Sequence, residues 1–210
     1  MIKTCSPDYI IADIVAECPE APAVLIQRSL MKAVRRMASA CLWECWIEIP
    51  TQDNVQRYPF ERYLPEGYSV QYVQDVEYNG CCIECLDDKC GQMCAAGYVL
   101  DDLCQITLRG YCPQSDPKDP ECRDTLRIKV ALKPKNDTCE LPCDLVERFE
   151  TELYDGTMGN LLSMKNKPWT DYKVAEYHEN QFEGGLASAK CLNGNKMNNK
   201  GASIEAACIL

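Results

Sequence analysis

The stretch LRIKVALKP at residues 126–134 decides the fold class, because its apolar side chains recur at every second position. These residues are Leu126, Ile128, Val130 and Leu132. A period of two predicts a β-strand with one buried face. Beyond Pro142 apolar residues recur three or four positions apart, which predicts helices. Strand and helix patterns in separate blocks predict an α+β fold.

The strand pattern extends upstream of this stretch, from Thr51 to about Lys135. Aromatic and β-branched residues alternate between Val70 and Tyr78, and Asn79-Gly80 is a hairpin signal. A further pair of strands is expected at residues 98–108 and 126–132. The proline-rich segment 112–120 between them predicts an exposed loop.

Helical spacing appears on both sides of this β-rich block. It predicts helices near residues 22–46, 142–164 and 171–191, the second interrupted locally by Gly156 and Gly159 and the third capped by Thr170 or Asp171. From these patterns we expect residues 1–50 and 139–191 to be mainly helical and residues 51–138 to be β-rich and Cys-rich. Residues 192–210 are expected to form an extended C-terminal arm.

The charge balance limits the function. The 210 residues carry 22 Lys and Arg against 32 Asp and Glu, a net charge of −10. An acidic chain lacks the clustered cations of a groove that grips nucleic-acid phosphates. No apolar run approaches the ~20 residues of a membrane span. No signal-peptide pattern is visible, so we expect synthesis in a reducing cytoplasm.

The 16 cysteines leave three interpretations open. A zinc site is one, with Cys82, Cys85, Cys90 and Cys94 as candidate ligands, although a single C-x-x-C is fewer than the two knuckles of most structural sites. Disulfides formed after the protein leaves a cell are the second. Reduced thiols that pack as small hydrophobic side chains are the third, and they suit Cys41 and Cys45 on the apolar stripe of the first helix. We expect no cofactor.

Catalytic patterns are absent from the sequence. The one histidine, His178, lies among polar neighbours and is expected to be a solvated surface residue. No phosphate-binding loop, zinc-protease motif or nucleophile elbow occurs, so no enzyme is predicted. The first predicted helix carries a basic stripe with two interpretations, a solvated face or a contact with an acidic partner subunit. The stripe consists of Arg28, Lys32, Arg35 and Arg36.

Two other segments have a distinct character. Lys167, Pro168 and Trp169 form a rigid corner between the last two helices, where packing of the Trp169 ring in the core is favoured over ligand binding. The C-terminal arm is polar with an apolar tip, which is typical of a segment that folds when it binds a neighbour. Its candidate binding residues are Asn193, Asn195, Asn198, Lys200, Ile204, Ile209 and Leu210.

Short motifs over about residues 10 to 190 resemble the head-to-tail adaptor (connector) proteins of tailed bacteriophages. They are CPEAP at 18–22, YLPEG at 63–67, VEYNG at 76–80, LKP at 132–134 and KPWTD at 167–171, followed by Ala175, Tyr177, Phe182, Gly185 and Ala189. The dense cysteines between Gly80 and Cys122 depart from that family's pattern.

The resemblance implies a structural virion protein rather than an enzyme. It also implies a small helical bundle domain of residues 1–50 and 139–191, interrupted by a β-rich, Cys-rich insertion domain of residues 51–138. Such proteins form a ring, commonly dodecameric, in the virion neck between capsid and tail. The ring binds the portal protein, often through C-terminal arms, and meets a downstream tail or nozzle protein, while genomic DNA passes through without specific binding. An acidic channel suits that passage, because it repels phosphates. The alternative from another class is a cysteine-rich zinc-binding interaction module.

Overall fold

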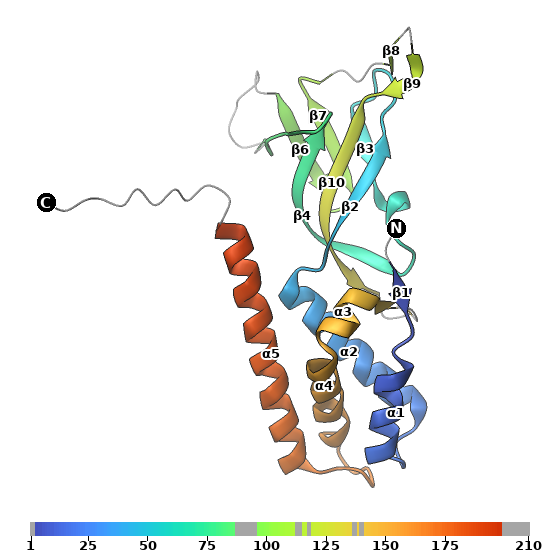
Figure 1. Ribbon diagram of the computed structural model, residues 1–210, viewed down its shortest axis with the longest axis vertical. Coiled ribbons are helices and arrows are strands. Elements are labelled where there is room, and N and C mark those ends of the chain that lie inside the picture. The colour runs from blue at the N-terminus through green and yellow to red at the C-terminus, as the bar shows by residue number, and fades with distance from the viewer. Residues whose placement is uncertain are drawn as a thin grey trace, which may run out of the picture. The chain divides into compact units, whose positions relative to one another are not determined.

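The computed structural model describes residues 3–86, 96–111, 115–116, 119–135, 138 and 141–198. The described chain divides into two compact units (Figure 1). Each unit contains its own buried apolar residues. Residues 3–42 and 141–198 form the helical unit, and residues 43–138 form the β unit. This combination confirms the expected α+β class.

The helical unit is assembled from both ends of the described chain. Its elements are β1 (Thr4–Cys5), α1 (Asp8–Glu17), α2 (Ala23–Cys41), β11 (Leu141–Pro142), α3 (Cys143–Arg148), α4 (Glu150–Leu162) and α5 (Tyr172–Asn198). The short strands β1 and β11 pair antiparallel, and they join the segment before α1 to the segment before α3. Helices α2, α4 and α5 pack against one another, and α1 packs against α2 and α4.

Helix α2 ends earlier than its sequence pattern predicts. The helix stops at Cys41, because Leu42 adopts a left-handed conformation with φ of 45° and its N–H donates to the carbonyl of Ala38. Residues 44–50 then form strand β2 rather than a last helical turn. The helical prediction continued to Trp46 because Cys45 lies four residues after Cys41. The alternation of the buried residues Ile47 and Ile49 indicates a strand, but the helical spacing of Cys41 and Cys45 favoured a helix.

Glycines permit the close packing of α4 against α5. A Cβ added at Gly156 would lie 2.9 Å from the Phe182 ring, and one at Gly159 would lie 3.2 Å from the Glu179 backbone nitrogen. Neither glycine interrupts α4, which is continuous from Glu150 to Leu162. The expected local break is therefore wrong, since tertiary packing outweighs the ~1 kcal/mol helical penalty of each glycine.

The last two predicted helices also differ at their ends. The predicted helix 142–164 is divided into α3 and α4 at Phe149, whose φ of −121° is not helical. Helix α5 continues to Asn198, so the start of the predicted arm at residues 192–198 is helical. A helix whose first turns are already packed can propagate through Asn and Gly at modest cost.

The β unit is a contiguous stretch of antiparallel strands. Its elements are β2 (Glu44–Pro50), β3 (Arg57–Pro59), the 3-10 turn η1 (Glu61–Tyr63), β4 (Tyr68–Tyr78), β5 (Cys81–Cys82), β6 (Gly97–Asp102), β7 (Gln105–Arg109), β8 (Ser115–Asp116), β9 (Asp119–Arg123) and β10 (Thr125–Pro134). The strand orders are β2-β10-β4-β5, β3-β7-β6 and β8-β9.

Strand β10 lies in the middle of the first sheet, between β2 and β4. Leu126, Ile128, Val130 and Leu132 are completely buried, as the alternating pattern predicts. On the opposite face Lys129 pairs with Glu44 at 2.7 Å, and Arg127 pairs with Glu77 at 3.3 Å. One face of β10 is therefore core and the other carries cross-strand ion pairs.

Two predicted strand boundaries need correction. Residues 98–108 hold a hairpin of β6 and β7 instead of one strand, with the turn at Leu103 and Cys104. The segment 112–120, predicted to be a loop, includes β8 and the start of β9. Proline is tolerated at the edges of such a small two-stranded sheet, where the missing N–H donor costs little.

Candidate interaction surfaces

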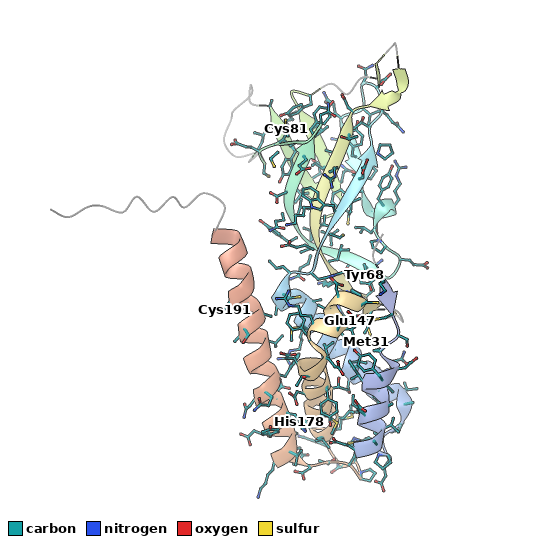
Figure 2. All side chains as sticks on the ribbon, in the orientation of Figure 1. Met31, Tyr68, Cys81, Glu147, His178 and Cys191 are labelled. Atoms are coloured by element: carbon teal, nitrogen blue, oxygen red, sulfur yellow. The ribbon has the colours of Figure 1, made fainter. Side chains whose placement is uncertain are left out.

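His178 is a structural residue of the helical unit and not a solvated one. The residue lies on α5 (Figure 2) and is buried at 9% exposure. Its Nδ1 lies 2.7 Å from Asp155 Oδ1. The Tyr154 and Tyr177 rings meet the imidazole edge-on. The expected surface position is therefore wrong. The neighbours of His178 in the sequence are polar, but its partner carboxylate comes from α4, a different helix.

The four candidate zinc ligands are described only in part. Cys82 ends β5 and Cys85 forms a bridge with Tyr98, and both cysteines are exposed. Cys90 and Cys94 lie outside the described residues. The described part of the chain contains no group of three or more His, Cys, Asp or Glu arranged to hold a metal ion. The complete four-cysteine site therefore stays a prediction.

Several other thiols are placed where they react poorly. Burial raises the pKa of Cys45 to about 11, and burial with a hydrogen bond to Cys143 raises the pKa of Cys5 to about 12. Cys18 and Cys143 are buried thiols. A protonated thiol is a weak nucleophile, so Cys5 and Cys45 act as small apolar side chains. Burial gives Cys18 and Cys143 the same packing role. Cys45 does so from β2, and not from the helical stripe where it was expected.

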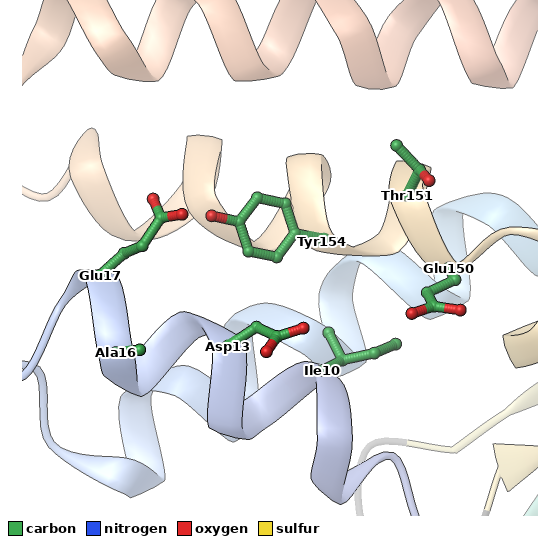
Figure 3. Close-up of a pocket in the computed structure, with 7 residues that line it drawn as sticks. All are labelled: Ile10, Asp13, Ala16, Glu17, Glu150, Thr151 and Tyr154. Atoms are coloured by element: carbon green, nitrogen blue, oxygen red, sulfur yellow. The ribbon is translucent and has the colours of Figure 1, made fainter.

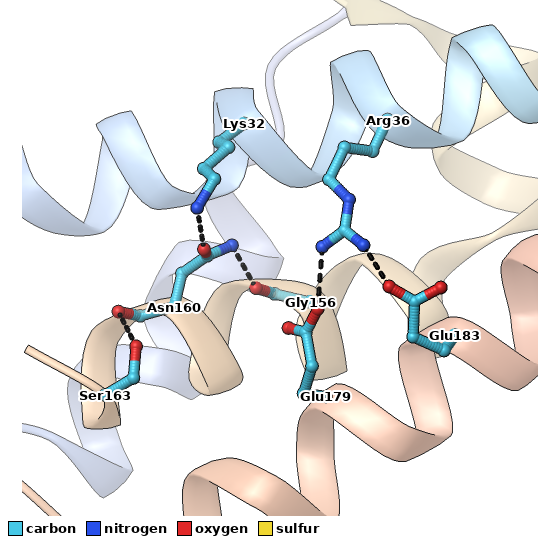
Figure 4. Close-up of polar contacts among 7 residues, drawn as sticks. All are labelled: Lys32, Arg36, Gly156, Asn160, Ser163, Glu179 and Glu183. Atoms are coloured by element: carbon cyan, nitrogen blue, oxygen red, sulfur yellow. Dashed lines mark hydrogen bonds and ion pairs between the residues drawn. The ribbon is translucent and has the colours of Figure 1, made fainter.

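The basic stripe of α2 is partly used inside the helical unit (Figure 4). Lys32 Nζ donates to Asn160 Oδ1 at 2.6 Å, which joins α2 to α4. Arg36 pairs with Glu179 at 2.8 Å and with Glu183, and its guanidinium lies 4.8 Å from the Phe182 ring centre. Arg28 is exposed and Arg35 is half-buried. Two of the four cations therefore bind within the chain, and Arg28 and Arg35 are left for other contacts.

The predicted corner lies in the turn between α4 and α5. Lys167 and Pro168 are exposed, and Trp169 is half-buried with a buried indole nitrogen that has no hydrogen-bond partner among the described residues. The Thr170 hydroxyl accepts from the Lys167 N–H at 3.1 Å and donates to the Met164 carbonyl. Asp171 Oδ1 accepts from the backbone N–H groups of Lys173 and Val174, at 3.0 and 3.2 Å, and so caps α5 as predicted.

The predicted portal-binding arm is described only at its start. Asn193, Asn195 and Asn198 lie in the last turns of α5. Lys200, Ile204, Ile209 and Leu210 lie outside the described residues. Binding of the portal protein by the apolar tip of the arm therefore remains a prediction.

A groove of about 440 Å³ lies between α1 and α4 (Figure 3). Ile10 and Ala16 contribute carbon surface, and Asp13, Glu17 and Glu150 contribute carboxylates. Thr151 and Tyr154 complete the lining. We call this feature the α1–α4 groove. Its acidic rim and carbon floor suit a long cationic side chain, whose alkyl stem packs on carbon while its charge meets a carboxylate.

Tyr154 fixes one end of the groove. Burial, followed by a hydrogen bond to Glu17, raises the pKa of this phenol far above its ordinary value. The phenol therefore stays protonated and donates to the Glu17 carboxylate, which holds that side chain in place. Sequence reasoning missed the groove. The spacing of four between Asp13 and Glu17 signals a shared helix face, but the proximity of Glu150 depends on tertiary packing.

Comparisons with protein families and with curated proteins assign no role to these surfaces. No family model matches the chain, and no curated protein matches it. Among the described residues, no helix is both long enough and apolar enough to span a membrane.

Proposed function

We propose that this chain is a structural virion protein, a head-to-tail adaptor whose copies form a ring, commonly of twelve. The ring binds the portal protein, extends the DNA channel and meets a downstream tail or nozzle protein in the virion neck. Genomic DNA passes through it without specific binding. The chain acts by assembly and not by catalysis.

The observation that carries this proposal is the way the helical unit is built. Its helices come from residues 3–42 and 141–198, and the β unit is inserted between them. The resemblance implies this same order of elements: a small bundle, a β insertion and a last helix that leads to the C-terminal arm. Helix α5, with 27 residues, more than doubles the 13 residues of α4 and carries the chain toward that arm.

Charge supports the same proposal. The net charge of −10 gives a protein that repels the DNA backbone instead of holding it. Lys32 and Arg36 on α2 are engaged with side chains of α4 and α5, which reduces the cationic surface that could retain a duplex. Passage of DNA needs a channel that does not bind phosphates, because each phosphate contact would add affinity for the duplex.

The test is binding to portal rings of the same virus, measured by native mass spectrometry and sedimentation. We expect the full chain to add to portal rings, and a chain that ends at Asn198 to stay folded but fail to join them. The double variant Ile204→Asp with Leu210→Asp is expected to bind at least tenfold more weakly. Ser203→Asp, which adds charge without removing apolar surface, is the matched control.

Each result has a separate meaning. If the full chain never joins portal rings, the adaptor function is wrong. If the shortened chain joins them with unchanged affinity, the function stands and the arm is not the portal-binding element.

The exposure of Cys82 and Cys85 favours one competing function, a zinc-binding interaction module. Elemental analysis of the purified full chain separates the two functions. About one zinc per chain, lost in the Cys82→Ser variant but kept in the Cys191→Ser control, would support the module. The adaptor proposal expects no bound zinc.

A further inference from the structure

Two cations on α2, the exposed Arg28 and the half-buried Arg35, have no partner within the described residues. Arg28 and Arg35 form no hydrogen bond or ion pair there, whereas Lys32 and Arg36 are bound to α4 and α5. Arg28 and Arg35 lie seven residues apart, which places them on the same side of α2. Their location therefore identifies a face of the helical unit that is locally cationic.

This cationic face and the α1–α4 groove point in different directions. Helix α2 turns its buried residues, including Ile26, Leu30 and Val34, toward the helices on which it packs. Arg28 and Arg35 lie on the other side of the helix and so point away from α1 and α4. Figure 3 shows α2 behind the two helices that form the groove.

The two surfaces are complementary in charge, in apolar content and in length. The groove offers Asp13, Glu17 and Glu150, and the α2 face offers two guanidinium groups. Val24, one turn before Arg28, is 60% exposed and matches the carbon floor that Ile10 and Ala16 provide. Arg28 and Arg35 are seven residues apart, as are Ile10 and Glu17, so both surfaces extend about 10 Å along a helix at 1.5 Å per residue.

We propose that the α1–α4 groove of one copy receives Arg28 and Arg35 from α2 of a second copy. This inference rests on the proposed function, because it names the contact that builds the ring. The two surfaces are different patches on the same unit, so the contact is head-to-tail. A head-to-tail contact gives a closed ring when its rotation closes, whereas a self-complementary patch gives only a dimer.

The physical character of this contact makes it sensitive to salt. Exposed ion pairs are screened beyond about 8 Å at physiological ionic strength, so association weakens as salt is added. Each copy contributes one groove and one cationic face, and closure of the ring adds further contacts to individually weak ones. An acidic protein can thus self-associate although its copies repel one another at long range.

Charge reversal on the full-length chain tests the proposal. The stripe variant is Arg28→Glu with Arg35→Glu, and the groove variant is Asp13→Lys with Glu150→Lys. Glu17 is left intact because it bonds Tyr154. We expect each variant alone to self-associate at least tenfold more weakly than the unmodified chain in sedimentation at low salt. The control variant reverses two exposed charges on α5, Glu176→Lys with Lys190→Glu, and should associate normally.

Mixing gives the decisive result. In a one-to-one mixture the groove variant offers two basic surfaces and the stripe variant two acidic ones, so every contact between unlike copies is complementary. We expect assembly to return on mixing, with alternating copies in equal number, as measured by native mass spectrometry of isotope-labelled chains. A chain that carries all four reversals should also self-associate.

Three outcomes would overturn the proposal: an unmodified chain that stays monomeric at every concentration, variants that associate normally, or mixtures that fail to recover. Binding of free spermidine in the groove without recovery on mixing would identify a polycation site instead of a contact between copies. Portal binding is scored separately. Loss of portal binding alone contradicts the adaptor function, and loss of recovery alone contradicts the contact.

Discussion

The helical unit and the β unit are stabilised by contacts of different range along the chain. In the helical unit, polar contacts join residues that lie on either side of the β unit in the sequence. Arg36 of α2, for example, pairs with Glu179 of α5. In the β unit, ion pairs such as Lys129 with Glu44 join neighbouring strands within one continuous stretch. The difference teaches that the described strands of the β unit pair within one continuous stretch of chain, whereas the bundle needs both ends of the described chain.

The largest effect expected from this difference is at Phe182. This side chain is completely buried on α5 and contacts Gly156 of α4 and Arg36 of α2. Phe182→Ala should cost about 3–5 kcal/mol, because a large ring is lost where three helices meet. Hydrogen exchange should show reduced protection in α2, α4 and α5 and unchanged protection in β10. The exposed Tyr177→Ala is the control, and equal losses in β10 would contradict the separation of the units.

The corresponding substitution in the β unit is at Ile128. Ile128 is completely buried in the middle strand of its sheet, and Ile128→Ala should cost about 2–5 kcal/mol. The loss of exchange protection should include β2 and β4 and leave α4 and α5 unaffected. Protection lost equally throughout the chain would mean that the two units unfold together.

Glycine substitutions sharpen the comparison inside the helical unit. Gly156→Ala places a Cβ 2.9 Å from the Phe182 ring and should destabilise by about 1–3 kcal/mol. Gly184 has no atom within 4 Å of an added Cβ, so Gly184→Ala should stabilise α5 by up to about 1 kcal/mol. Urea denaturation of both variants tests this, and a similar change in both would show that α4 and α5 do not pack closely.

The smallest expected effect is a pH dependence in the β unit. Hydrogen bonds from Gln105 and Thr107 lower the pKa of Asp101 below 3.8. Because the folded value is the lower one, this stabilisation is present above about pH 4 and lost as pH falls through the folded pKa. The difference in β6–β7 exchange protection between the natural chain and Asp101→Asn should therefore shrink in acid. A difference that grows in acid would contradict this assignment.

The predictability of the two units from sequence also differs. The alternation at Leu126 and Ile128 predicts β10 well, because a strand with one buried face has an apolar residue at every second position. The same reasoning fails at His178, whose partner Asp155 comes from the preceding helix, α4. It also misplaces Cys45, because a spacing of four fits a helix until Leu42 turns the backbone into the left-handed region.

The candidate surfaces follow the same division. Arg28 and Arg35 are visible in the sequence as members of a basic stripe, but their availability depends on which neighbours bind Lys32 and Arg36. The α1–α4 groove needs Glu150 beside Asp13, which no local pattern provides. Local chemistry can thus be predicted, while the pairing of surfaces depends on how distant segments pack.

The split construction of the bundle has a consequence for synthesis on the ribosome. Helix α2 ends at Cys41, and α4, on which it packs, begins at Glu150, more than a hundred residues later. At elongation rates of about 5–20 residues per second, about 5–20 s pass between the synthesis of α2 and the synthesis of α4. The β unit can fold during that delay. Until α4 is made, the apolar stripe of α2 lacks its partner, so the nascent chain exposes a hydrophobic helix to which a chaperone can bind.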